Sequence, residues 1–167
     1  MSDDLPAAAQ RFQEALNSKG INRTVRVMPD TTRTSTEAAA AIGCDVGQIA
    51  KSLIFRGKQS GCAVLVIASG ANRVDVKAVR GVIGEKIGKA DADFVKSATG
   101  YSIGGVPPFG HDQEPIVVID QDLMQLSEIW AAGGTPFAVF PVSPEELVGA
   151  TNGKVAVIAA RSDEARA

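Results

Sequence analysis

The residues best suited to chemistry lie in one glycine- and proline-rich stretch, Gly100 to His111, which reads Gly-Tyr-Ser-Ile-Gly-Gly-Val-Pro-Pro-Phe-Gly-His. It ends in His111, the only histidine of the chain. Proline fixes φ, while glycine permits positive φ and close backbone approach, so this stretch predicts a shaped loop. A stiff loop that carries the sole imidazole is suited to the wall of a pocket. An ordinary connection between a helix and a strand is the alternative.

A second candidate is Lys51, the first residue of a predicted strand over residues 51–56. The two-residue period of a strand places Lys51 on one face with Leu53 and Phe55. A lysine held among apolar neighbours is a fixed positive charge available to a phosphate or a polarised carbonyl group. The alternative is a lysine whose ammonium group simply extends to water.

Standard catalytic and metal-binding motifs are absent from the sequence. It has no Walker A motif, no G-x-S-x-G or H-E-x-x-H motif, and no Rossmann glycine fingerprint after a strand. Its two cysteines, Cys44 and Cys62, with a single histidine, argue against a disulfide framework and a zinc site. Cys44 stays open as a nucleophile, but small buried thiols are favoured. We therefore expect no metal and no cofactor.

The composition is that of an ordinary globular domain. The chain has 167 residues, of which 45% are hydrophobic and 22% charged. No apolar run approaches the length of a membrane span, and the acidic start lacks the features of a signal peptide. We expect a single cytoplasmic domain over residues 1–167, without membrane contact and with a frayed tail from Arg161.

The charge is unevenly distributed. Between Lys51 and Lys96 there are nine Lys or Arg and four Asp or Glu, a local net charge of +5, in a chain whose net charge is −2. A basic segment in an acidic protein can form a local anion-binding face, on which Arg73, Lys77 and Arg80 are the candidate contacts. Solvated helices are the alternative.

Periodicity and capping signals predict about six strands interleaved with short helices. Helices are expected over residues 6–19, 34–42, 76–83, 91–98 and from Ser143, and strands over residues 24–28, 51–56, 63–68, 115–120, 137–141 and 154–159. The helices are too few and too short for a regular βαβ series. The predicted fold is α/β (α+β-like), with one mixed, curved, partly barrel-like sheet wrapped by short helices.

Three stretches together resemble the YbaK/prolyl-tRNA synthetase-associated editing domain family. They are residues 48–55 (Gln-Ile-Ala-Lys-Ser-Leu-Ile-Phe), residues 104–111 (Gly-Gly-Val-Pro-Pro-Phe-Gly-His) and residues 130–134 (Trp-Ala-Ala-Gly-Gly). The resemblance implies a trans-editing enzyme that hydrolyses the ester of a mischarged aminoacyl-tRNA of the tRNA(Pro) type. The implied partners are the acceptor end of the aminoacyl-tRNA and an aminoacyl-tRNA synthetase. With tRNA as the partner, the expected tRNA-binding residues are Arg73, Lys77 and Arg80.

The resemblance also implies roles for individual residues. Lys51 and His111 match functional positions of the family, so we assign them the catalytic roles. Substrate-binding positions are expected at Ser52, Gly104, Gly105, Val106, Pro107, Ala132, Gly133 and Gly134. We interpret Gly104 and Gly105 as glycines because their backbone meets the aminoacyl group and at least one of them has positive φ. The second glycine-rich loop departs from the cysteine-specific members, so the amino acid removed stays open.

The mechanism that these residues favour has no covalent nucleophile. An aminoacyl ester is already activated, so a positioned water and stabilisation of the developing oxyanion suffice. Assistance by the substrate's own amine or thiol is a second route. Two other classes stay open, namely a non-catalytic module that binds aminoacyl-tRNA or a protein, and a small nucleotide-binding protein, for which the sequence offers no phosphate-binding loop.

Overall fold

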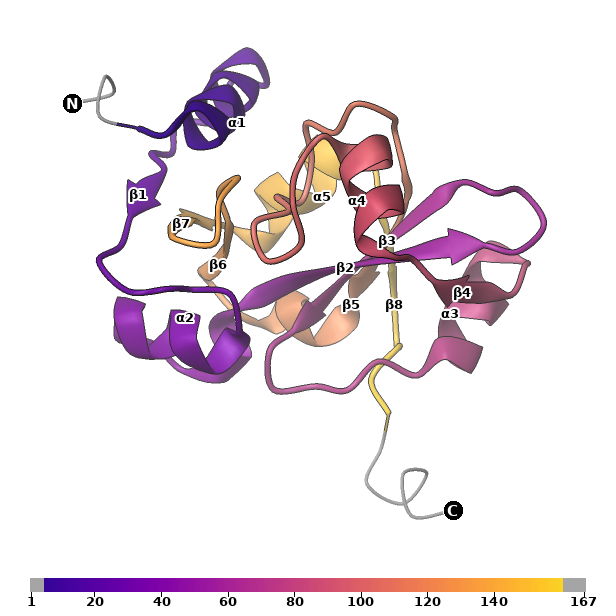
Figure 1. Cartoon of the computed structure of the whole chain (residues 1–167). Helices are drawn as coiled ribbons and strands as arrows, with labels where there is room; N and C mark the ends of the chain where they lie inside the picture. Colours follow the sequence, from indigo (N-terminus) through magenta and orange to yellow (C-terminus); the bar gives the residue numbers. More distant parts are fainter. Residues whose placement is uncertain (1–4, 161–167) are drawn as a thin grey trace.

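The computed structural model describes residues 5–160, and the expected fraying from Arg161 falls outside that range. The described chain is a mixed α/β fold with five α-helices and two sheets (Figure 1). None of its helices is long and apolar enough to cross a membrane. The helices are α1 (Ala7–Ser18), α2 (Ser35–Ile42), α3 (Val76–Ile83), α4 (Ala92–Thr99) and α5 (Pro144–Thr151). Two 3-10 helices also occur, η2 (Val46–Gln48) before strand β2 (Ala50–Gly57) and η3 (Gln121–Gln125) after strand β5 (Ile116–Asp120).

The larger sheet has the strand order β4-β2-β3-β5-β8. Strand β2 runs antiparallel to β3 and β4, whereas β3, β5 and β8 run parallel. The smaller sheet has the order β1-β7-β6 and is antiparallel. The strands are β1 (Arg26–Val27), β2 (Ala50–Gly57), β3 (Ala63–Ser69), β4 (Ile87–Lys89), β5 (Ile116–Asp120), β6 (Ile129–Ala132), β7 (Ala138–Val142) and β8 (Lys154–Ala156).

The prediction of one partly barrel-like sheet is not confirmed. The strands form two separate sheets and neither closes on itself. A single bridge, between Ile49 and Trp130, joins the start of β2 to β6. The mixed character of the larger sheet agrees with the prediction.

Two strands were missing from the sequence-based description. Strand β4 has three residues and occupies an edge of the larger sheet. Strand β6 lies directly before the second glycine-rich loop, and its residues read as the start of that loop. Short strands depend on the partner that pairs with them more than on their own propensity, which is why pattern alone did not reveal them.

Helix α1 holds the Gly100–His111 loop against the smaller sheet. Phe12 of α1 is fully buried, and its ring lies 5.0 Å from that of Phe109 in the loop and 4.8 Å from that of Phe140 in β7, measured between centroids. Figure 1 shows the loop after α4 reaching back towards β6 and β7. The three rings therefore join the N-terminal helix, the loop and the sheet into one core.

Candidate active site

A pocket of about 260 Å³ lies where the two sheets approach each other, along one edge of β2. Strand β3 pairs with β2 from Ala50 to Arg56, but β4 pairs only with residues 55–57. The first half of β2 therefore has the pocket beside its second edge, and consecutive residues from both faces of the strand reach it. The lining comprises Thr32, Arg33, Thr34, Ser35, Ala38, Ile49, Ala50, Lys51, Ser52, Leu53, Ile103, Gly104, Val106, Trp130, Ala131, Ala132 and Val139.

Lys51 supplies a cation to this pocket. Its Nζ donates a hydrogen bond of 2.7 Å to the backbone carbonyl of Asn72, and the side chain is partly buried. Burial lowers the pKa of Lys51, and the charge of Asp120 opposes that shift. An ammonium group has three N–H donors, so the bond to Asn72 leaves two available for a ligand.

Ser52 offers a polar group that the described residues do not satisfy. Its Oγ is buried and has no hydrogen-bond partner within residues 5–160. Buried hydroxyl groups are nearly always hydrogen-bonded, and one without a partner in a pocket wall is suited to a ligand.

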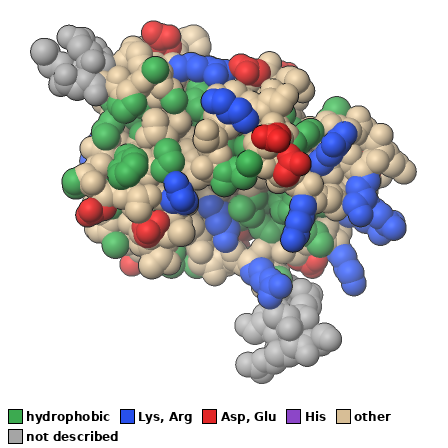
Figure 2. All heavy atoms as spheres, viewed as in Figure 1, with side chains coloured by type: hydrophobic (Ala, Val, Ile, Leu, Met, Phe, Trp, Pro, Cys, Tyr) green, Lys and Arg blue, Asp and Glu red, His purple; other side chains and the backbone are tan. Residues whose placement is uncertain are grey.

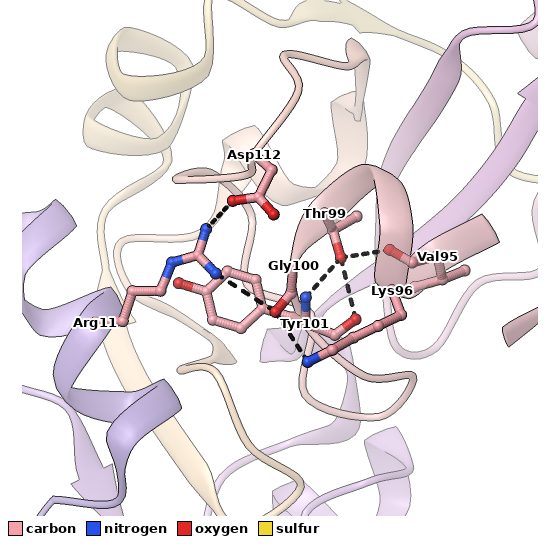
Figure 3. Close-up of polar contacts among 7 residues, drawn as sticks. All are labelled: Arg11, Val95, Lys96, Thr99, Gly100, Tyr101 and Asp112. Atoms are coloured by element: carbon pink, nitrogen blue, oxygen red, sulfur yellow. Dashed lines mark hydrogen bonds and ion pairs between the residues drawn. The ribbon is translucent and has the colours of Figure 1, made fainter. Parts of the chain in front are cut away.

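The Gly100–His111 loop is rigidly tied at its ends (Figure 3). The amide of Asp112 bonds to the carbonyl of Thr99 at 3.1 Å, which closes the loop onto the end of α4. Arg11 from α1 forms an ion pair with Asp112, and its guanidinium lies 4.6 Å from the centre of the Tyr101 ring. The loop is thus shaped, as the glycines and prolines predicted.

The two glycines of this loop differ in their surroundings. Gly104 lines the pocket with φ of +94°, which confirms that one of the pair has positive φ, and a Cβ there would lie 3.0 Å from Arg33 Cγ. A Cβ on Gly105 would lie 2.7 Å from backbone atoms of Thr135. Gly105 is therefore glycine because two loops touch there. Val106 is buried and lines the pocket with Gly104.

His111 lies apart from the pocket that contains Lys51. Its Nε2 contacts the carbonyl of Pro107 at 2.7 Å, and the ring borders a second hollow with Lys19 and Lys154. Burial is the main cause that lowers the pKa of His111. The structure therefore does not bring the two predicted catalytic residues together. Pro107, a buried residue of the same loop, is the partner of His111 and does not line the pocket that contains Lys51.

The second glycine-rich loop contributes one of its three predicted residues to the pocket. Ala132 lines it, but Gly133 and Gly134 do not. A Cβ on Gly133 would lie 2.9 Å from Val25, and one on Gly134, whose φ is +110°, would lie 2.6 Å from the Ala8 carbonyl oxygen. These two glycines let β6 turn towards β7 beneath α1.

The predicted tRNA contacts are exposed. Arg73 precedes α3, and Lys77 and Arg80 lie on its exposed side. Figure 2 shows Lys and Arg side chains gathered over β4, α3 and the hairpin between β2 and β3, whereas acidic side chains lie mainly elsewhere on this face. The basic segment of the sequence is thus also a basic region of the surface.

Sequence reasoning missed several residues around the pocket. Arg33, from the segment before α2, adds a second cation to the lining, and Trp130 forms an apolar wall beneath Arg26. The backbone carbonyl of Asn72 accepts the hydrogen bond from Lys51, and the side chain of Asn72 donates one to Asp120. The available signal was Asp120, a carboxylate that ends the apolar run of β5.

The cysteines do not serve this site. Cys62 is exposed, so the expectation of a buried thiol is wrong for this residue. Cys44 is partly buried against an apolar cluster and is not itself part of the pocket lining. Burial raises the pKa of the Cys44 thiol, which is the opposite of what activates a nucleophile. No group of His, Cys, Asp and Glu suited to a metal ion occurs among the described residues.

The chain belongs to the aminoacyl-tRNA editing domain family, whose model matches residues 29–150. The match includes Lys51 and the whole Gly100–His111 loop.

Similar proteins include two relatives and a solved structure. The chain is 35% identical over 114 residues to the uncharacterized protein YwhH of Bacillus subtilis (strain 168), covering 68% of this chain and 72% of the relative. It is 28% identical over 121 residues to the "Putative Cys-tRNA(Pro)/Cys-tRNA(Cys) deacylase EbsC" of Enterococcus faecalis (strain ATCC 700802 / V583), covering 72% and 73%. A crystal structure of "a putative trans-editing enzyme for prolyl tRNA synthetase" superposes with a TM-score of 0.89 at 42% identity, covering 95% of this chain and 100% of that one.

Replacing Gly105 by alanine tests the contact between the two loops. Because the new Cβ would meet the backbone of Thr135, we expect the Gly105→Ala variant to lose about 1–3 kcal/mol of unfolding free energy in denaturant titrations. The matched control is Gly149→Ala in α5, where no atom lies within 4 Å of the added Cβ. That variant should gain about 0.5–1 kcal/mol, and equal stabilities of the two variants would contradict the packing argument.

The burial of His111 predicts a pH-dependent stability. The pKa of His111 in the folded state lies below the unfolded value of about 6.5, because burial favours the neutral ring. The contribution of His111 to the free energy of unfolding is therefore complete above that pH, and it is lost as the pH falls through the folded-state pKa. We expect the melting temperature of the wild-type protein to fall in this window, and His111→Asn to flatten the decline. A variant with the wild-type pH dependence would show that another group is responsible.

Proposed function

We propose that this protein is a trans-editing hydrolase that deacylates mischarged aminoacyl-tRNA, with Lys51 as its key catalytic residue. The observation that carries the proposal is that one small, largely apolar pocket is lined by both Lys51 and Ser52, whose hydroxyl has no hydrogen-bond partner among the described residues. Membership of the editing family supports it, as does similarity to EbsC, named as a putative Cys-tRNA(Pro)/Cys-tRNA(Cys) deacylase, and to a putative trans-editing enzyme for prolyl tRNA synthetase.

The size and lining of the pocket favour a small, uncharged amino acid. Its volume of about 260 Å³ is below the range of about 300–1,000 Å³ for drug-sized ligands. Ala38, Ile49 and Val139 give it apolar walls. We assign this space to the aminoacyl group, with the terminal ribose at the pocket mouth near Arg33.

The proposed reaction is the attack of water on the ester carbonyl carbon. The water oxygen forms the new bond, the bond to the ribose oxygen breaks, and the proton passes to that oxygen, so free amino acid and tRNA leave. The free N–H donors of Lys51 would stabilise the negative charge that develops on the carbonyl oxygen. Ser52 would orient the aminoacyl group.

His111 takes a positioning role in this proposal. Its ring bonds to Pro107 and so fixes the loop segment that presents Gly104 and Val106 to the pocket. The tRNA body would contact the basic surface with Arg73, Lys77 and Arg80. A prolyl-tRNA synthetase is the proposed source of the mischarged substrate.

Lys51→Ala is the direct test of the proposed activity. We expect kcat/KM for release of the amino acid from a mischarged tRNA(Pro) to fall by about 10²–10³-fold, because a group that stabilises the oxyanion is lost. The control is Lys19→Ala, which removes an exposed lysine that borders the other hollow. The wild-type protein is assayed against tRNAs charged with a series of amino acids. Binding without release of amino acid would favour the non-catalytic module.

The basic surface predicts a salt-sensitive interaction with tRNA. Lys77→Glu combined with Arg80→Glu should weaken tRNA binding and reduce its dependence on salt concentration, because phosphate contacts release counterions. The matched control is Lys19→Glu with Lys154→Glu, which changes the net charge equally at the other hollow. If both double variants lose affinity alike, only the overall charge matters and the proposed tRNA surface is wrong.

A further inference from the structure

Behind the pocket, a buried carboxylate organises the turn that holds Lys51. Asp120, the last residue of β5, is 1% exposed. One oxygen of its side chain accepts hydrogen bonds from the Ser69 amide at 3.1 Å and from the Asn72 side-chain amide at 2.9 Å. The other oxygen accepts from the amide of Asp122 at 3.0 Å and caps η3.

We propose that Asp120 is a positioning residue of the deacylation site, which acts through Asn72 to fix the ammonium group of Lys51. The path consists of two consecutive contacts that join three residues. The carboxylate of Asp120 binds the side chain of Asn72, and the backbone carbonyl of the same asparagine accepts the Lys51 Nζ bond of 2.7 Å. This inference rests on the proposed function, since it concerns the same site.

The geometry of the turn explains why this anchor is needed. Residues 69–73 connect β3 to the segment before α3, and the amide of Asn72 bonds back to the carbonyl of Ser69 at 2.9 Å. Asp120 therefore binds both ends of a single turn. A turn fixed at both ends holds its carbonyl groups in place, and with them the lysine.

The burial of Asp120 also argues for a specific role. A buried carboxylate is costly to desolvate and is weak evidence for stability by itself. Capping η3 needs only one of its oxygens, and an exposed aspartate would do the same. The second oxygen is directed entirely to the turn that carries Asn72.

Asp120 has an electrostatic effect on Lys51 as well. Burial lowers the pKa of Lys51, and the negative charge of Asp120 raises it. The other charged groups around this lysine are Asp122 of η3, which bonds to Asn72, and Arg33, which lines the same pocket. Asp120 thus favours the protonated lysine that oxyanion stabilisation requires.

The test compares Asp120→Asn and Asn72→Ala with the control Asp122→Asn. Asp122 also accepts from the Asn72 side chain, at 2.8 Å, but it is exposed. Each variant is measured for kcat and KM on a mischarged tRNA across neutral to alkaline pH. The pKa of Lys51 is measured without substrate by NMR titration of its side-chain signals, assigned with Lys51→Arg. Thermal melting reports whether each variant folds.

Asp120→Asn keeps an acceptor oxygen but removes the charge. We expect the titration of Lys51 and the alkaline limb of kcat to shift together to lower pH, with KM little changed. A shift of one unit lowers the protonated fraction about tenfold above the pKa. Asn72→Ala keeps the charge of Asp120 but removes the side chain that fixes the backbone carbonyl bonded to Lys51. We expect kcat to fall, with a smaller shift of the Lys51 titration than in Asp120→Asn. Asp122→Asn should resemble the wild type.

Two outcomes would overturn the proposal. One is a folded Asp120→Asn variant with the wild-type pH profile and Lys51 titration. The other, decisive if Asp120→Asn does not fold, is an Asn72→Ala variant with unchanged kcat and Lys51 titration. If the wild-type protein releases no amino acid from any tRNA, the proposed function fails, and the NMR titration alone then decides whether Asp120 controls Lys51.

Discussion

Incomplete pairing of β2 is the constraint on which the candidate site depends. The strand lies second in the larger sheet, between β4 and β3, yet the edge strand β4 covers only the last part of its second edge. Backbone N–H and C=O groups at an unpaired edge are costly to bury without partners. A pocket beside this edge lets water or a ligand reach those groups. Consecutive residues point to opposite faces of a strand, but both reach an open edge. This is why Lys51 and Ser52 can line the same pocket.

The loop opposite that edge keeps its shape because it is packed from outside. Arg11 and Phe12 of α1 contact it on two sides, and Gly105 lies against the backbone of Thr135. The side chain of His111 bonds within the loop itself. A wall fixed in this way loses little conformational freedom when a ligand binds, which favours binding and orientation of a small group.

Local signals revealed those parts of the fold and site that depend on nearby residues. The capping box of Thr34 and Glu37 and the left-handed Gly43 define α2 as predicted. Lys51 and Gly104, which both line the pocket, could be predicted as candidates because the period of a strand and a glycine-rich loop are visible in short stretches of sequence. Strand β6, the separation of His111 from Lys51, and the contact of Asp120 with Asn72 depend on residues distant in the sequence. No local pattern specifies such contacts, and even the resemblance to a family predicted Gly133 and Gly134 as substrate-binding residues of a pocket whose lining does not include them.

The partner chosen for Lys51 is important for the proposed chemistry. Within the described residues Lys51 forms no ion pair, and its contact is a neutral carbonyl group. A carboxylate in direct contact would neutralise much of the ammonium charge before any substrate arrived. The carboxylate of Asp120 instead contacts Asn72, the residue that bonds to Lys51. From that distance it favours the protonated lysine and leaves the remaining N–H groups of the ammonium free. Such a cation interacts more strongly with the oxyanion of the transition state than with the neutral ester, and this difference is what accelerates a reaction.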